Sequence, residues 1–99
     1  MREKSVENDI KDYLFSQGIY HFKVHGSNFM EPGISDIVAC LDGHFLGIEV
    51  KAPGKKNQQS EQQKVHERNL TKSGGTYLLV DSLNEVVEYV TNYRNKGEL

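Results

Sequence analysis

Residues 35–51 read SDIVACLDGHFLGIEVK, and this stretch decides the fold. Two strand-like runs, residues 35–41 and 44–51, stand on either side of the dipeptide Asp42-Gly43. Asp-Gly between apolar runs is a strong hairpin signal, because a type I′ turn needs positive φ at both central positions. The sequence therefore predicts a β-hairpin closed by a two-residue turn.

A two-residue turn also fixes which residues of the hairpin face each other. Leu41 pairs with His44, and the same register continued along both strands pairs Asp36 with Glu49. The two carboxylates then lie with Cβ atoms roughly 4.5–5.5 Å apart, an arrangement that is destabilising for like charges. A hard divalent cation between the carboxylates would remove this repulsion. Lys51 follows Glu49 by two residues, so its side chain emerges on the same face.

The alternative interpretation of this pair is an exposed polar strand face on which two acids oppose each other by accident. Acidic residues are depleted in strands, which weighs against that alternative. Small or apolar residues also share the face with the two acids, namely Val38, Cys40 and Gly47. We therefore favour a functional site.

Helical patterns are expected in three segments. Apolar residues recur at helical spacing in residues 5–17, with Ser5 as the candidate N-cap and Gly18 as the stop. The other two helices cover residues 60–73 and about 83–95, opened by the capping boxes Ser60-x-x-Gln63 and Ser82-x-x-Glu85.

Strand patterns at residues 19–24 and 76–81 join the hairpin in the predicted sheet. The element order is α-β-β-β-α-β-α, typical of a small α/β domain with a central mixed sheet of about four strands flanked by helices. A chain of 99 residues has the size of one domain, which we place at residues 1–99. Its core is small, and dimer formation would enlarge it.

Composition excludes several classes of protein. A single Cys rules out an internal disulfide framework and a Cys-based zinc site, and it suits a reducing compartment. Charges run through the first twelve positions, so the N-terminus does not resemble a signal peptide. No apolar run approaches the roughly 20 residues of a membrane helix. We expect no membrane partner and a cytoplasmic location.

The net charge of -2 hides two blocks of opposite sign. Residues 26–50 hold four acids and no Lys or Arg, and residues 51–73 hold six bases and two acids. Solvated faces explain such blocks in most proteins. A metal site beside a phosphate-binding surface would also produce them. The candidate phosphate contacts are Lys55, Lys56, Lys64, Arg68 and Lys72.

Two further residues are candidates for the site. Glu7 lies at the edge of the apolar stripe of the first helix, where a third carboxylate would reach a metal. A first-turn Glu that is favoured by the helix dipole is the alternative explanation. Gln63 opens the second helix, and its place in a capping box explains it equally well.

Together these motifs resemble the VRR-NUC (virus-type replication-repair nuclease) family of PD-(D/E)XK nucleases, in its stand-alone phage form. The resemblance is carried by G-I-S-D at 33–36, G-I-E-V-K at 47–51 and S-E-Q-Q at 60–63. It extends from Glu7 to about Val90 and implies a restriction-endonuclease-like fold. Ser35 stands where the family name has Pro, which would supply backbone rigidity and no chemistry.

The resemblance implies a role for each site residue. It assigns Mg²⁺ or Mn²⁺ binding to Glu7, Asp36, Glu49 and the Val50 carbonyl. It makes Lys51 catalytic, together with Asp36 and Glu49, and gives Gln63 a supporting role from the following helix.

The activity implied by the resemblance is metal-dependent hydrolysis of DNA by a homodimer that acts on branched duplexes such as four-way (Holliday) junctions. It places the protein in a bacterial or phage-infected host cell. The alternatives are a non-catalytic nucleic-acid-binding module of the same fold and a sequence-specific restriction-type endonuclease. A small protein-interaction domain is a further alternative, but it leaves the facing carboxylates unexplained.

Overall fold

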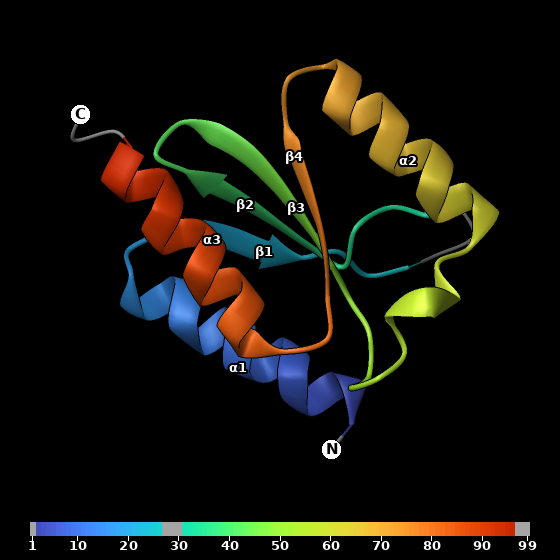
Figure 1. The fold of residues 1–99 in the computed structure, drawn as a ribbon, viewed down its shortest axis with the longest axis horizontal. Helices are drawn as coiled ribbons and strands as arrows, with labels where there is room; N and C mark the ends of the chain where they lie inside the picture. The colour runs from blue at the N-terminus through green and yellow to red at the C-terminus, as the bar shows by residue number, and fades with distance from the viewer. Residues whose placement is uncertain (1, 27–30, 97–99) are drawn as a thin grey trace.

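The computed structural model describes residues 2–26 and 31–96, and its element order is the predicted one (Figure 1). Between α2 and the hairpin lies one short 3₁₀ helix, η1. The elements are α1 (Glu3–Ser16), β1 (Tyr20–Lys23), β2 (Ile37–Leu41), β3 (His44–Val50), η1 (Lys56–Gln58), α2 (Glu61–Lys72), β4 (Thr76–Val80) and α3 (Leu83–Lys96).

The hairpin has the predicted turn and register. Asp42 and Gly43 both have positive φ, at 50° and 89°, as a type I′ turn requires. Leu41 lies opposite His44, and the antiparallel β2–β3 ladder runs to the pair of Ile37 and Ile48. Asp36 is therefore one residue outside the strand and is not a ladder partner of Glu49.

The four strands form one mixed sheet, as predicted, and their order in the sheet is β1-β2-β3-β4. β1 pairs with β2 antiparallel, and β4 pairs with β3 parallel. The α2 helix lies in the crossover between these two parallel strands. In Figure 1, α1 and α3 lie together on one side of the sheet, and α2 lies apart from them.

Alternation along the hairpin gives the sheet two different faces. One face packs against α1 and α3 through buried apolar side chains, among them Ile37 and Ile48 of the hairpin, Ile10 of α1 and Val86 of α3. The neighbouring positions, including Glu49, point to the opposite face, on which α2 is attached. The candidate site residue Glu49 and the apolar core thus lie on opposite sides of the same strands.

The helix starts confirm one predicted cap and correct another. Ser60 and Gln63 form the reciprocal capping box of α2. The prediction that Ser5 caps the first helix was wrong, because α1 begins at Glu3 with Arg2 as N-cap and without a side-chain cap bond. The good helix formers at positions 3 and 4 extend the helix backwards, so Ser5 lies within its first turn.

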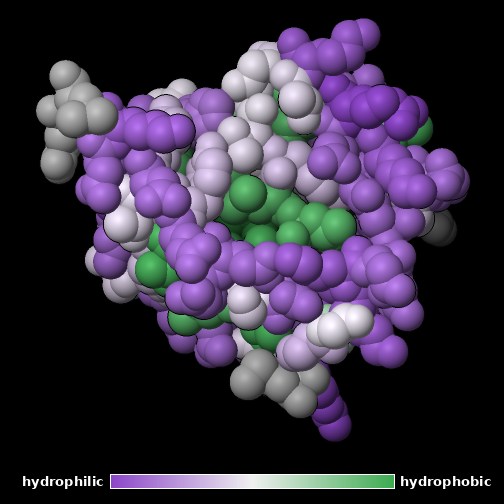
Figure 2. All heavy atoms as spheres, in the orientation of Figure 1, coloured by the Kyte–Doolittle hydropathy of each residue, from purple (hydrophilic) through white to green (hydrophobic). Residues whose placement is uncertain are grey.

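The surface seen in Figure 2 is mostly hydrophilic. Apolar atoms show between α2 and α3, where β4 runs along the edge of the sheet in Figure 1. Among residues 2–26 and 31–96, no helix combines the length and the apolar character needed to cross a membrane.

Gly33 brings the loop before β2 against the start of α2. Its φ is +86°, and a Cβ added there would lie 2.4 Å from the carbonyl oxygen of Gln62. Only glycine allows this close approach between two backbones without a steric clash. The approach sets where α2 begins relative to the hairpin.

We predict that Gly33→Ala destabilises the protein more than Gly54→Ala. Gly54 has a similar φ of +81°, but an added Cβ meets no atom within 4 Å. Gly54→Ala should cost about 1 kcal/mol for backbone strain alone. Gly33→Ala should cost about 1–3 kcal/mol more because the loop and helix must separate. Urea unfolding measures both, and equal losses would contradict a role for Gly33 in the approach.

Candidate active site

Asp36 is held beside Glu49 by a hydrogen bond that replaces the next ladder pair. Its Oδ2 accepts the backbone N–H of Val50 at 2.8 Å. Its backbone carbonyl accepts the N–H of Val24 at 2.8 Å. Asp36 therefore joins the chain after β1 to the end of β3, and the two acids lie together as the hairpin register predicted.

Glu49 is a buried carboxylate with one oxygen left unsatisfied. The residue is 4% exposed, and its Oε1 has no hydrogen-bond partner among the residues that the structure describes. Burial, followed by repulsion from the Asp36 carboxylate, raises the pKa of Glu49 to about 8. The position therefore favours either a proton or an added cation.

Gln63 connects Glu49 to Lys51. Its Nε2 donates to Glu49 Oε2 at 2.8 Å, and its Oε1 accepts from Lys51 Nζ at 3.2 Å. The same Oε1 accepts the Ser60 N–H at 2.9 Å as part of the capping box. The Gln63 side chain thus confirms the predicted cap of α2 and also contacts Glu49 and Lys51. Lys51 Nζ lies 3.9 Å from Glu49 Oε2.

Glu7 reaches the site through a lysine that sequence reasoning missed. The Glu7 carboxylate is buried and accepts from Lys23 Nζ at 3.0 Å. Lys23 Nζ is also 3.9 Å from Asp36 Oδ1. One signal existed in the sequence: alternation in residues 19–24 places Lys23 on the face that packs against the first helix. A lysine there needs an acidic partner.

Ser35 and His66 fasten α2 to the hairpin. Ser35 is 1% exposed, and its hydroxyl lies 3.0 Å from His66 Nε2 on α2. A Cβ added to Gly47 would lie 2.6 Å from the same hydroxyl, so Gly47 leaves the space that Ser35 fills. Ser35 therefore has a packing and hydrogen-bonding role here.

The five basic residues predicted to contact phosphate lie in different environments. Lys64, Arg68 and Lys72 are exposed at i, i+4 and i+8 along α2, so they line one helix face. Lys64 also pairs with Glu61 at 3.2 Å. Lys55 is exposed in the loop before η1, whereas Lys56 forms a salt bridge with Glu85 of α3.

The residues present fit a divalent cation in part. No group of three or more His, Cys, Asp or Glu side chains within residues 2–26 and 31–96 lies close enough together to hold a metal ion. Asp36 and Glu49 form a pair, and Lys23 contacts the third carboxylate, Glu7. The unsatisfied buried oxygen of Glu49 can accept a cation in place of a proton, and carboxylate oxygens suit Mg²⁺ and Mn²⁺.

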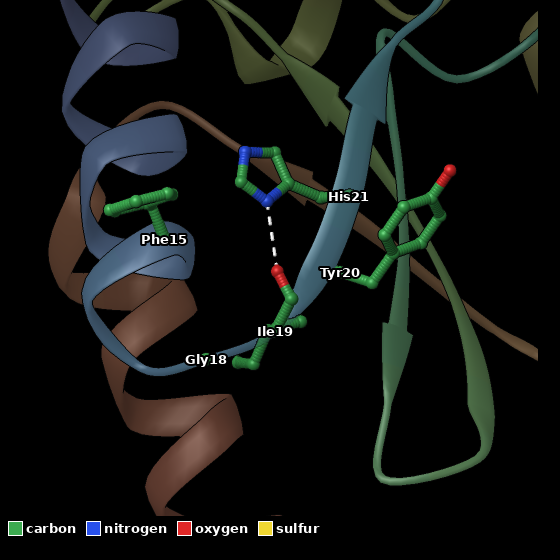
Figure 3. A pocket seen from close by; sticks show the side chains of 5 residues that line it. All are labelled: Phe15, Gly18, Ile19, Tyr20 and His21. Carbon is green, nitrogen blue, oxygen red and sulfur yellow. Dashed lines mark hydrogen bonds between the residues drawn. The ribbon is translucent and has the colours of Figure 1, made fainter.

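A separate pocket lies at the other end of β1, beside the C-terminal end of α1 (Figure 3). Its volume is about 350 Å³, and it is lined by Phe15, Gly18, Ile19, Tyr20 and His21. His21 Nδ1 lies 2.9 Å from the Ile19 carbonyl oxygen, and a dashed line marks this contact in Figure 3. None of the candidate catalytic residues lines this pocket.

The raised pKa of Glu49 predicts a specific pH dependence of stability. An acid whose pKa is about 8 when folded and 4.5 when unfolded binds more protons in the folded state between these values. Wild-type stability therefore falls as the pH rises through this range. Glu49→Gln removes this pH-dependent loss of stability. The variant should be about 2 kcal/mol more stable than wild type at high pH, and this gain should vanish at low pH.

Urea unfolding in EDTA at a series of pH values measures this difference. Glu88→Gln on the exposed side of α3 is the matched control and should follow the wild type throughout. Parallel pH curves for wild type and Glu49→Gln would show that the carboxyl titrates normally.

No protein-family model and no curated protein matches the sequence. A solved structure described as "VRR_NUC domain" is similar, with a TM-score of 0.74 over 92% of this chain and 96% of that chain. The aligned residues are 19% identical, so the likeness concerns the fold. The four-stranded mixed sheet, its three helices and their order are those of a VRR_NUC domain, which has a restriction-endonuclease-like fold.

Proposed function

We propose that this protein is an endonuclease that uses Mg²⁺ or Mn²⁺ to hydrolyse phosphodiester bonds in DNA. One observation carries the proposal: a buried, unsatisfied carboxylate oxygen of Glu49 lies in a site that also contains Asp36 and Lys51. The likeness in fold to a VRR_NUC domain supports the same chemistry.

Each side chain has a distinct task in this proposal. Asp36 and Glu49 hold the cation, with the Val50 carbonyl and Glu7 as further ligands. A bound Mg²⁺ or Mn²⁺ supplies Lewis-acid activation of the phosphate and a water molecule of lowered pKa. As an ammonium, Lys51 would orient the attacking water or stabilise negative charge on the phosphorane-like transition state, and as a neutral amine it would accept the proton of that water.

Gln63 is a positioning residue in this mechanism. Its amide group holds one oxygen of Glu49 and the ammonium of Lys51 at the same time. The other Glu49 oxygen therefore stays directed away from Gln63 and available to a cation.

The exposed basic face of α2 suits the phosphate backbone of DNA. Lys64, Arg68 and Lys72 follow one line along the helix that carries Gln63, and Lys55 precedes it. Contacts to phosphates position a duplex without reading its bases. Lys56 joins this surface in the proposal only by exchanging its contact with Glu85 for a phosphate.

Cleavage assays with labelled duplex DNA test the proposed chemistry. The wild type should cut DNA in Mg²⁺ or Mn²⁺ and not in EDTA. Asp36→Asn and Lys51→Ala should each lower the cleavage rate by about 10²–10³-fold, because each removes a charge that acts on the reacting groups. Lys96→Ala at the exposed end of α3 is the control and should retain full activity. DNA binding that persists in EDTA without cleavage in Mn²⁺ would instead identify a non-catalytic binding module.

The proposed substrate is branched duplex DNA, including four-way junctions, and the proposed working unit is a homodimer. One chain carries one such site, so symmetric cutting of a junction needs two copies, which a two-fold axis would place equivalently. The apolar surface at the β4 edge (Figure 2) and the adjoining α3 helix are candidate contact surfaces for the second copy.

We expect faster cleavage of four-way junctions than of linear duplexes of matched sequence, and a dimer in sedimentation at micromolar concentration. This expectation assumes that the protein recognises the shape of DNA, because the sequence has no helix-turn-helix or zinc-finger pattern. Equal cutting of both substrates would argue against branch selectivity. A monomer at all concentrations would remove the dimer and leave the nuclease chemistry intact.

A further inference from the structure

Lys23 lies beside the candidate site, although it belongs to none of the motifs identified in the sequence. It is the last residue of β1, and its side chain is 26% exposed. Its ammonium contacts Glu7 Oε2 at 3.0 Å and lies 3.9 Å from Asp36 Oδ1. One positive charge is therefore shared by two carboxylates of the proposed metal site, one from α1 and one from the start of the hairpin.

The burial of Glu7 explains why a positively charged side chain lies beside it. The Glu7 side chain is only 7% exposed, and an ionised carboxylate in such a position is costly without a charged partner. Lys11 also approaches Glu7, at 3.8 Å, from one turn along α1. Among residues 2–26 and 31–96, Lys23 is the lysine that contacts both Glu7 and Asp36.

We propose that Lys23 is an internal counter-ion that competes with the divalent cation for Glu7 and Asp36. This inference rests on the proposed function, since it concerns the same metal site. In this structure the Lys23 ammonium offsets part of the negative charge of the two carboxylates. A cation that takes Glu7 and Asp36 as ligands must release the ammonium first, so Lys23 sets the metal concentration at which the site fills.

The chemistry of lysine suits this exchange. A lysine ammonium is a point charge on a flexible four-carbon stem, so it can withdraw without moving the backbone. Its partial exposure gives it a path to solvent. A second positive charge within a few ångströms of a divalent ion opposes binding, and its removal should raise metal affinity on the order of tenfold.

The experiment measures Mn²⁺ binding to the full chain by isothermal titration calorimetry, without DNA. Lys23→Met removes the charge and keeps the length of the side chain, and we expect a Kd about tenfold lower than in wild type. Lys23→Arg keeps the charge and should stay within about twofold of wild type. Lys11→Met is the matched control, because Lys11 contacts Glu7 alone, and a smaller change is expected.

The direction of the change in Mn²⁺ affinity shows whether Lys23 competes with the metal or only supports the fold. If Lys23 only supports the fold, its loss should disorder Glu7 and Asp36 and weaken Mn²⁺ binding. Unchanged or weaker binding by a folded Lys23→Met would therefore overturn the proposal. If Lys23→Met has low stability, thermal unfolding with and without Mn²⁺ tests the same point. Tighter binding stabilises the folded state more, so Mn²⁺ should raise the Tm of the variant more than that of wild type.

The same titration distinguishes this inference from the proposed function. Absence of Mn²⁺ binding by both wild type and Lys23→Met would refute the metal site itself. Binding of equal affinity by both proteins would refute only the counter-ion role of Lys23.

Discussion

The hydrogen bond from the Val50 N–H to the Asp36 carboxylate is the contact on which the site depends. It continues the hairpin beyond its last ladder pair and fixes Asp36 beside Glu49. Two acids side by side, one of them buried, are unfavourable by themselves. The surrounding polar contacts, from Gln63 and Lys51 on one side and Lys23 on the other, offset part of that cost.

The α2 helix belongs to the site as much as to the fold. It lies against the hairpin because small residues, Gly33, Ser35 and Gly47, leave room at the approach. The same helix supplies Gln63 to the site and presents Lys64, Arg68 and Lys72 outward. Close packing on one side and a line of positive charge on another thus come from a single element placed in the β3–β4 crossover.

The parts of this architecture that depend on local spacing were predictable from sequence. The two-residue turn determined the register, and the register placed Asp36, Glu49 and Lys51 together. Contacts between distant segments were harder to foresee: Lys23 meets Glu7 across 16 positions and Ser35 meets His66 across 31. The prediction of Ser5 as the N-cap of the first helix was wrong for a different reason. Residues of high helix propensity before Ser5 extend the helix to Glu3.

The double use of the Gln63 side chain has a consequence for the dynamics of the protein. The first turn of a helix is normally among the first parts of a structure to fray. Here the amide that closes this turn also holds Glu49 and Lys51. Fraying of the first turn of α2 therefore also breaks the contacts of Gln63 with Glu49 and Lys51, so the local opening free energy of a single helical turn sets the fraction of molecules in which these contacts are intact.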